Sequence, residues 1–429
     1  MHKSIDRRRF LMGSAAVLAA GAAGIGPGLA QETRLRLVFW GSQGRADRTY
    51  GVTDLYTKAN PGVGIEGEFL GWADYWPKLA TQTAGGNAPD IIQMDYRYIV
   101  EYADRNAIAP LDAFVGSTLD VSAFDAAQVE GGKVNGKFYG VSLGANSAAM
   151  MLNKAAFEEA GVALPDQAIT WDQFAEMAKA ITDAGKRQGF HGTADGSGVE
   201  PLFENYLRQR GKALYTADGQ IAFDATDATE WFEMWAKMRE SGAAVPPDVQ
   251  ALDQFQIETG MVSLGKAAVS FAHSNQLVGY QAVNKDPLTL SNFPRLGAEG
   301  KGGHYRKPSM FFSVGAKSAN QEAAAKFISF FVNDPEAAKI LGVERGVPES
   351  SKVREALTPT LDELGQAAVN YVAGLGDLAG PLPPPPPAGA GEGELALRRV
   401  SEEVAFGGKS PADGGTALVA EITDILGRG

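Results

Sequence analysis

The spacing of hydrophobic positions along the chain predicts strands that alternate with helices. Residues 35–40 form a short apolar run, residues 52–59 repeat apolar side chains at helical spacing, and residues 64–70 form a second apolar run. A strand, a crossing helix and a second strand imply a mainly parallel sheet, whose ligands gather at the carboxyl ends of the strands. Segment 41–45 lies at such an end, so ligand contacts are expected there.

Two further runs predict a strand that changes sheets. Residues 138–143 and 148–152 are both β-prone, and only the small polar segment 144–147 separates them. Small residues tolerate backbone rotation, so this segment fits a hinge between two lobes with a ligand cleft between them. A strand, a bend and a strand within one sheet is the alternative interpretation.

Aromatic and acidic residues gather near the predicted carboxyl end of a strand. Trp72, Tyr75 and Trp76 precede a short apolar run that leads to Asp95 and Tyr96. Sugar rings stack on aromatic rings, and carboxylates bind paired hydroxyl groups, so this pattern fits a carbohydrate site. A purely structural role is the alternative: we expect Trp76 in the core, and Trp72 fits either role.

A second polar cluster follows the apolar run at residues 266–272. His273, Asn275 and Gln276 come directly after this run and fit the opposite wall of a cleft. No serine or carboxylate stands at a spacing that would make His273 catalytic, so we expect a hydrogen-bonding histidine. A stripe of aromatic and methionine residues elsewhere has helical spacing and predicts a core helix instead: Trp231, Met234, Trp235 and Met238.

The N-terminus and the composition indicate export. Residues 1–30 combine a basic start, a twin-arginine pattern at residues 7–11, an apolar stretch and small residues at its end, as in a signal peptide. We therefore expect a periplasmic protein. The chain has no cysteine and a net charge of −12; residues 1–30 contribute four basic residues and one acid, which leaves −15. Such acidity argues against nucleic acid or an anionic membrane as partner.

Several motifs, taken together, resemble the extracellular solute-binding proteins of sugar ABC importers, which are similar to the maltose-binding protein. The motifs follow the order of that family along the chain: Val38-Phe39-Trp40-Gly41, Gly71-Trp72, Asn135-Gly136-Lys137, Thr170-Trp171-Asp172, Lys307-Pro308-Ser309 and Arg345-Gly346-Val347-Pro348. The resemblance implies an α/β fold with two lobes, hinge crossings and a central ligand cleft. It also implies a carbohydrate ligand, permease subunits in the inner membrane as partners, a monomer, and neither metal nor cofactor.

The resemblance also implies how the chain divides. Lobe 1 is expected to comprise residues 31–144 and 286–333, and lobe 2 residues 145–285 and 334–429. The returning crossings are then expected near Asp286 and Asn333. Residues 383–387, five consecutive prolines, cannot form a helix or an inner strand and predict a semi-rigid surface loop.

Thirteen residues are expected to contact the ligand if the resemblance holds: Trp40, Gln43, Arg45, Trp72, Tyr75, Asp95, Tyr96, Asn146, His273, Asn275, Gln276, Ser309 and Arg345. The motifs around Arg45 and Arg345 look most like the oligogalacturonide-binding branch of the family. Asp95, however, stands where a neutral amide is expected, and a uronate close to it would be repelled. We therefore expect a neutral oligosaccharide or glycoside rather than a uronate.

A secreted glycoside hydrolase or lyase is the alternative function, because a fold alone does not determine activity. Hydrolysis needs two positioned carboxylates, and the sequence offers only Asp90 and Asp95 close together near this site. Residues 189–198 predict a loop in which His191 and Asp195 are weak candidates for a metal site. We therefore expect a binding protein and not an enzyme.

Overall fold

A computed structural model describes residues 33–297, 300 and 302–428, so the expected signal peptide lies outside the described residues. Strand β1 (Thr33–Trp40) ends in four buried residues, which is typical of a strand in the middle of a sheet. It pairs in parallel with β2 (Val63–Leu70) and β3 (Ile91–Met94). The five-stranded sheet is completed by β13 (Phe311–Val314) and β6 (Val141–Ser142), in the order β2-β1-β3-β13-β6.

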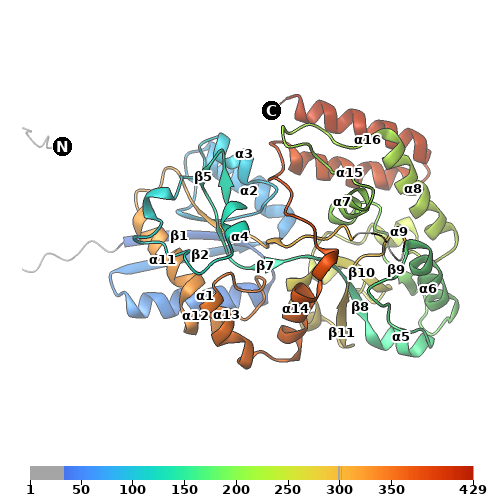
Figure 1. The fold of residues 1–429 in the computed structure, drawn as a ribbon, viewed down its shortest axis with the longest axis horizontal. Coiled ribbons are helices and arrows are strands. Elements are labelled where there is room, and N and C mark those ends of the chain that lie inside the picture. The colour runs from blue at the N-terminus through green and yellow to red at the C-terminus, as the bar shows by residue number, and fades with distance from the viewer. Residues whose placement is uncertain (1–32, 298–299, 301, 429) are drawn as a thin grey trace, which may run out of the picture. The chain divides into compact units, whose positions relative to one another are not determined.

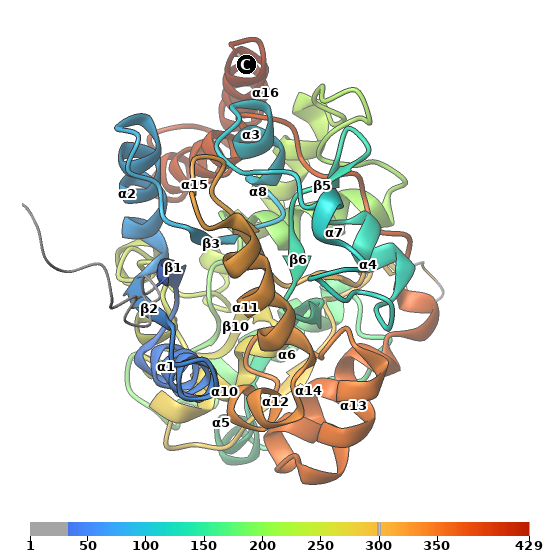
Figure 2. The ribbon, with the colours of Figure 1, turned by 90° about the vertical axis from the view of Figure 1, so that its left-hand side faces the viewer.

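Helices cover both faces of this sheet, and together they form the first lobe. On one face, α1 (Gln43–Ala59) packs against α11 (Gln321–Asn333) and α12 (Pro335–Leu341), with Tyr56 in ring contact with Phe327. On the other face lie α2 (Trp72–Ala84) and α3 (Ile99–Asp104), and Figure 2 shows α1 and α2 on opposite sides of β1 and β2. Trp76 is 9% exposed, so its predicted place in the core is confirmed.

The second lobe is built on a four-stranded sheet in the order β11-β8-β10-β9. Its strands are β11 (Leu288–Ser291), β8 (Ala148–Asn153), β10 (Ala267–His273) and β9 (His191–Thr193). Two predictions were wrong here. The run that begins at Leu288 was expected in the first lobe, but it pairs antiparallel with β8. Residues 189–198 were expected to be a loop, but three of them form β9, which pairs in parallel with β10.

The helices of the second lobe surround a core rich in aromatic residues. Trp231 and Trp235 on α8 (Ala225–Glu240) are fully buried and Met238 is nearly so, while Met234 is partly buried against the same core, which confirms the predicted core stripe. The other helices are α5 (Lys154–Ala160), α6 (Trp171–Asp183), α7 (Glu200–Gln209), α9 (Pro247–Gln250), α10 (Leu277–Val283), α14 (Glu363–Gly374), α15 (Ala390–Ala405) and α16 (Pro411–Leu426).

Three crossings between the lobes lie side by side and are hydrogen-bonded to one another (Figure 1). The first contains β7 (Ala145–Asn146), which pairs with β12 (Lys307–Pro308) of the second crossing. The third meets β7 through Ala145 N–H, which donates to Val347 O at 2.7 Å. The prediction that the chain changes sheets at residues 144–147 is confirmed.

The returning crossings lie elsewhere than expected. Asp286 forms an ion pair with Arg187 at 2.7 Å within the second lobe, and Asn333 donates to Asp120 O at 2.8 Å within the first. The chain passes between the sheets in residues 292–310, between β11 and β13, and again after α12. Gly144 is required at the junction, because a Cβ there would lie 2.8 Å from Arg345 O.

A fourth segment, residues 380–389, runs without regular structure from the end of the α14 region to α15. It contains the five prolines, and it contacts both lobes: Tyr96 Oη donates to Pro383 O at 2.6 Å, and Arg208 Nη2 donates to Pro381 O at 3.0 Å. Leu382 packs against the core of the first lobe. The prolines are partly exposed as predicted, but they also contribute to the cavity described below.

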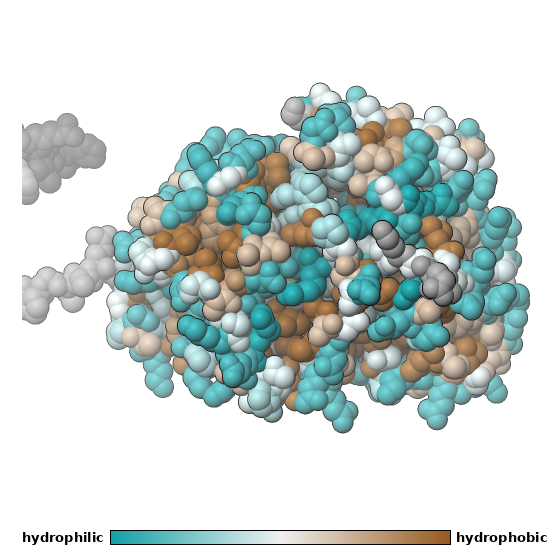
Figure 3. Space-filling model, viewed as in Figure 1, coloured by the Kyte–Doolittle hydropathy of each residue, from teal (hydrophilic) through white to brown (hydrophobic). Residues whose placement is uncertain are grey.

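The surface shown in Figure 3 intersperses hydrophilic and apolar side chains. Exposed large apolar residues such as Leu252, Leu395 and Phe406 are distributed among several elements. Within the described residues, no helix is both long enough and apolar enough to span a membrane.

Candidate functional site

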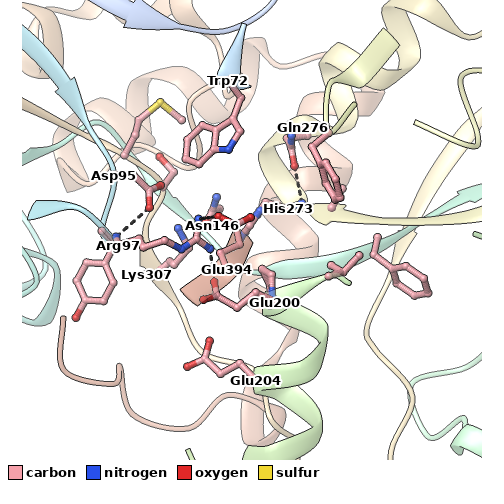
Figure 4. Close-up of a pocket in the computed structure, with 18 of the residues that line it drawn as sticks. Trp72, Asp95, Arg97, Asn146, Glu200, Glu204, His273, Gln276, Lys307 and Glu394 are labelled. Atoms are coloured by element: carbon pink, nitrogen blue, oxygen red, sulfur yellow. Dashed lines mark hydrogen bonds and ion pairs between the residues drawn. The ribbon is translucent and has the colours of Figure 1, made fainter. Parts of the chain in front are cut away.

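A cavity of about 310 Å³ lies between the two sheets. Its wall combines residues from both lobes and from the crossings (Figure 4). The proline segment also contributes to it. Ten of the thirteen predicted ligand contacts line it: Trp40, Arg45, Trp72, Asp95, Tyr96, Asn146, His273, Asn275, Gln276 and Ser309. Their contact with a ligand stays a prediction, but the fold does bring them together from distant parts of the chain.

The first-lobe wall is formed at the carboxyl ends of parallel strands. Trp40 ends β1, and its ring contacts that of Trp72, at the start of α2, edge-on with centroids 5.2 Å apart. Asp95 follows β3, and its Oδ1 accepts from Arg97 N–H at 2.9 Å. Trp72 is half-buried, so one part of its ring packs on the core while another faces the cavity.

The second-lobe wall begins where β10 ends. His273 N–H donates to Gln276 Oε1 at 2.8 Å, which turns the chain sharply into the cavity wall. Burial, followed by the charges of Lys307 and Arg97, lowers the pKa of His273 well below its usual value. The imidazole is therefore neutral at ordinary pH. It accepts from the backbone N–H of Gln276, which confirms the predicted hydrogen-bonding histidine.

Asn146, in the first crossing, has a side-chain acceptor that no described residue donates to. Its Nδ2 donates to Asn275 Oδ1 at 2.7 Å, and Asn275 Nδ2 donates to Glu344 O at 2.9 Å. Because a backbone carbonyl can only accept, this chain fixes the orientation of both amides. Asn146 Oδ1, an acceptor, has no hydrogen-bond partner among the described residues, although the side chain is buried and lines the cavity.

Three predicted contacts lie outside the cavity. Gln43 is exposed and donates to Asp47 at 2.7 Å, and Tyr75 is fully buried with its hydroxyl donating to Gln93 O at 2.5 Å. Arg345 is buried beside Phe39 and Phe331, with its guanidinium carbon 5.7 and 5.4 Å from their ring centroids. Arg345 Nη2 donates to Thr49, so this arginine ties the third crossing to α1.

Arg45 reaches the cavity wall, but its charge is already matched. Its guanidinium forms a buried ion pair with Glu344, with Nη2 and Oε1 2.8 Å apart, and its Nη1 donates to Trp40 O at 3.1 Å. Arg45 therefore braces the first lobe against the third crossing, and little of its hydrogen-bonding capacity is left for a carboxylate ligand.

Several lining residues were not anticipated from the sequence. Arg97 of the first lobe forms ion pairs with Glu200 on α7 and, at 2.7 Å, with Glu394 on α15, both in the second lobe. Glu204 lies one turn further along α7 and accepts from Tyr305 Oη at 2.6 Å. Arg97 could have been predicted as a cavity residue, because it follows Asp95 by two residues at the end of a strand. Nothing in the sequence around Glu394 marks it as a cavity residue.

Four of the prolines, Pro383–Pro386, form another part of the wall that sequence reasoning missed. Proline fixes φ near −65° and biases the preceding residue toward extended ψ, so consecutive prolines adopt a stiff polyproline II conformation. The cavity is therefore bounded on one side by a segment with little conformational freedom.

Two sheets joined by hydrogen-bonded crossings around a polar and aromatic cavity define a two-lobe solute-binding fold. The chain belongs to the bacterial extracellular solute-binding protein family, whose profile matches residues 42–338. It is 30% identical to an extracellular solute-binding protein family 1 structure from Alicyclobacillus acidocaldarius, with a TM-score of 0.66 over 92% of this chain and 98% of that chain.

Two further relatives have names that mention carbohydrates. A periplasmic oligogalacturonide-binding protein of Yersinia enterocolitica, solved with saturated digalacturonic acid, has a TM-score of 0.82 at 21% identity, over 92% of this chain and 99% of that chain. A carbohydrate ABC transporter substrate-binding protein of Streptococcus pneumoniae is 34% identical over 110 residues, which are 24% of this chain and 22% of that protein. The chain spans about half the length (47%) of the first curated relatives that it matches.

Proposed function

We propose that this protein is the periplasmic carbohydrate-binding component of an ABC importer. In this role it captures an oligosaccharide or glycoside between its lobes and delivers it to permease subunits in the inner membrane. The observation that carries the proposal is the cavity between the lobes, where aromatic rings from one lobe face amide and imidazole groups from the other. Family membership and the carbohydrate-binding relatives support the same role.

The chemistry of the wall suits a polyhydroxylated ligand. Trp40 and Trp72 offer ring surface to sugar C–H faces, while Asp95, Asn146 and Gln276 offer acceptors and donors to hydroxyl groups. Because these groups come from both lobes and a crossing, a ligand that touches all of them favours the closed arrangement by the contacts it gains there.

The experiment is a ligand screen on the purified chain from residue 31 onward. Thermal unfolding is followed in the presence of neutral, amino and acidic oligosaccharides, and binding is confirmed by calorimetry. A ligand present at a hundred times its Kd raises the free energy of unfolding by about 2.7 kcal/mol. If no carbohydrate raises the unfolding temperature, the proposed ligand class is wrong.

A hydrolase or lyase remains the competing function, because carboxylates line the cavity. Burial raises the pKa of Glu200, the direction that a general acid requires, although the ion pair with Arg97 occupies its carboxylate. Each oligosaccharide that binds is therefore incubated with the protein and analysed for cleavage products. Turnover that survives purification and is lost in both Asp95→Asn and Glu200→Gln would replace the transport proposal with an enzymatic one.

A further inference from the structure

Acidic residues outnumber basic residues in the wall of the cavity. Carboxylate residues are twice as numerous as lysine and arginine residues in the wall. All three lining arginines are already paired: Arg45 with Glu344, Arg97 with Glu200 and Glu394, and Arg398 with Glu394. The arginines therefore offer no free positive charge to an acidic sugar.

Several carboxylates of the cavity wall form no ion pair with a lysine or an arginine. Asp95, Glu204 and Asp253 form no ion pair within the described part of the chain, and the one lining lysine is Lys307. Burial raises the pKa of both Glu204 and Asp253, that of Asp253 to about 6. The nearby charges of Arg208, Arg97 and Lys307 on Glu204, and of Arg398 on Asp253, offset this only in part. A positive charge brought into the cavity would relieve this imbalance.

A second, independent feature points to a ligand that donates hydrogen bonds. Asn146 is 2% exposed, and its Oδ1, fixed as an acceptor by the amide chain to Asn275, lacks a partner among the described residues. The hydroxyl groups that every sugar carries can donate to it, and so can an ammonium group. Leaving a buried acceptor unpaired disfavours binding, so the cavity selects for donors.

The walls also suit an organic cation better than a metal ion. The described residues contain no group of three or more acidic, histidine or cysteine side chains placed to coordinate a metal. Aromatic side chains, among them Trp40, Trp72 and Tyr280, line the same cavity as the unpaired carboxylates. Aromatic faces attract ammonium groups, particularly where water is excluded.

From these observations we propose that the ligand is an oligosaccharide or glycoside that carries at least one protonated amino group. The proposal rests on the carbohydrate-binding function proposed above and narrows it to a charge class. It replaces the sequence-based expectation of a neutral ligand, and it opposes a uronate more strongly than the sequence did. The unpaired carboxylates of both lobes, Asp95 on one and Glu204 and Asp253 on the other, attract the ammonium group.

The test compares sugars that differ only in charge. Calorimetry at about pH 7 and low salt measures Kd for glucosamine oligomers, their N-acetylated counterparts of equal length, neutral gluco- and galacto-oligosaccharides, and digalacturonate. We expect at least about tenfold tighter binding of the amino form than of its N-acetylated counterpart, because hydrogen bonds to charged groups are roughly that much stronger. Added salt should reduce this preference.

Variants of single carboxylates test which of them cause the preference for the amino sugar. In Glu204→Gln and in Asp253→Asn the amino preference should fall to about threefold or less, while Glu322→Gln, which removes the same charge from the exposed side of α11, should keep it. Equal or tighter binding of the N-acetylated, neutral or uronate sugar overturns the charge proposal and leaves carbohydrate binding intact. If no sugar of the panel binds, the proposed function itself fails, and the charge proposal fails with it.

Discussion

Arg45 and Arg345 show how the role of a residue depends on a partner that the local sequence does not reveal. Both stand in motifs that resemble a uronate-binding branch, yet the structure pairs Arg45 with Glu344 and buries Arg345 between two phenylalanines. Arg45 and Glu344 are 299 positions apart. The sequence predicted that residues at the end of a strand face a cleft. It could not predict which of the charged residues there form ion pairs within the protein and which remain available to a ligand.

Glu349 is a buried acid at the third crossing, and it carries a prediction on pH dependence. It is 2% exposed, its Oε1 accepts from Ser142 Oγ at 3.1 Å, and burial raises its pKa from 4.5 to about 7. The folded protein therefore holds a proton that the unfolded chain releases above pH 4.5. Between about pH 4.5 and 7 this group lowers the free energy of unfolding as pH rises, by roughly 3 kcal/mol in total.

Glu349→Gln keeps the size of the side chain and mimics its protonated form. We expect the variant to exceed the parent in free energy of unfolding at pH 8, and the difference to shrink toward zero near pH 5. Urea denaturation at several pH values measures this difference. Glu322→Gln is the control, because an exposed acid should give a small difference that does not change with pH. A difference for Glu349→Gln that is constant between pH 5 and 8 would show that its carboxyl group ionises normally.

At the scale of the elements, the best predictions rested on signals within a few residues. The short apolar run that leads to Asp95 forms strand β3 (Ile91–Met94). Helix α5 ends at Ala160 and is capped by Gly161, whose φ is 69°, and α6 begins with a capping box between Thr170 and Gln173. At such caps, a side chain or a residue with left-handed backbone conformation satisfies the free backbone groups at the helix end. Because only a few residue types can do this, caps can be predicted from the local sequence.

Elements whose position depends on distant partners were less predictable. The run that forms strand β11 was assigned to the wrong lobe, because its place beside β8 depends on pairing across more than a hundred positions. Strand β9 is only three residues long and has no alternating pattern, so it was missed. The proline segment was predicted to lie at the surface, but its second role in the cavity wall depends on contacts with Tyr96 and Arg208.

Two tryptophans on different helices should separate binding from stability. Trp235 on α8 is fully buried and in ring contact with Trp171 and Phe271, so Trp235→Ala should cost roughly 3–5 kcal/mol of unfolding free energy. Trp72→Ala should weaken sugar binding substantially. It also removes the edge contacts with Trp40 and Trp76, so a smaller stability loss of about 1–2 kcal/mol is expected.

Urea unfolding of both variants, and calorimetry with the sugar that binds the parent most tightly, give the two measurements. Trp235→Ala should bind that sugar as the parent does at temperatures where it is folded. The division of roles is wrong if Trp235→Ala unfolds at the same urea concentration as the parent, or if Trp72→Ala keeps the parent's affinity.

For the whole molecule, the ion pairs of Arg97 connect the lobes directly across the cavity. Its side chain comes from the first lobe, and both of its glutamate partners come from the second (Figure 4). Arg97→Ala leaves Glu200 and Glu394 without this cation and removes a contact that exists only when the lobes are close. We expect the ligand-free variant to be more open, with a larger radius of gyration in solution scattering and a weaker apparent affinity for sugar.

Saturating sugar should restore the parent's radius in the variant, because ligand contacts then hold the lobes together. Arg105→Ala is the control, since that arginine is largely exposed and pairs only with Glu101 one turn away on the same lobe. Glu394→Gln provides a second route to the same effect with a smaller change in volume. Equal radii for the ligand-free parent, Arg97→Ala and Glu394→Gln would show that these pairs do not hold the lobes together.

The proline segment has a mechanical consequence for the movement of the lobes. A polyproline II chain rises about 3.1 Å per residue, already close to the maximum of roughly 3.3–3.6 Å for any extended chain. Residues 380–389 begin and end on the second lobe, and midway Leu382 and Pro383 are attached to the first. The proline run within this strap can lengthen by only about a tenth, so the first lobe can swing only until the strap is taut or until Tyr96 releases Pro383. The width of the entrance, and with it the bulk of any molecule that can enter, is therefore set in part by the length of a strap that can lengthen very little.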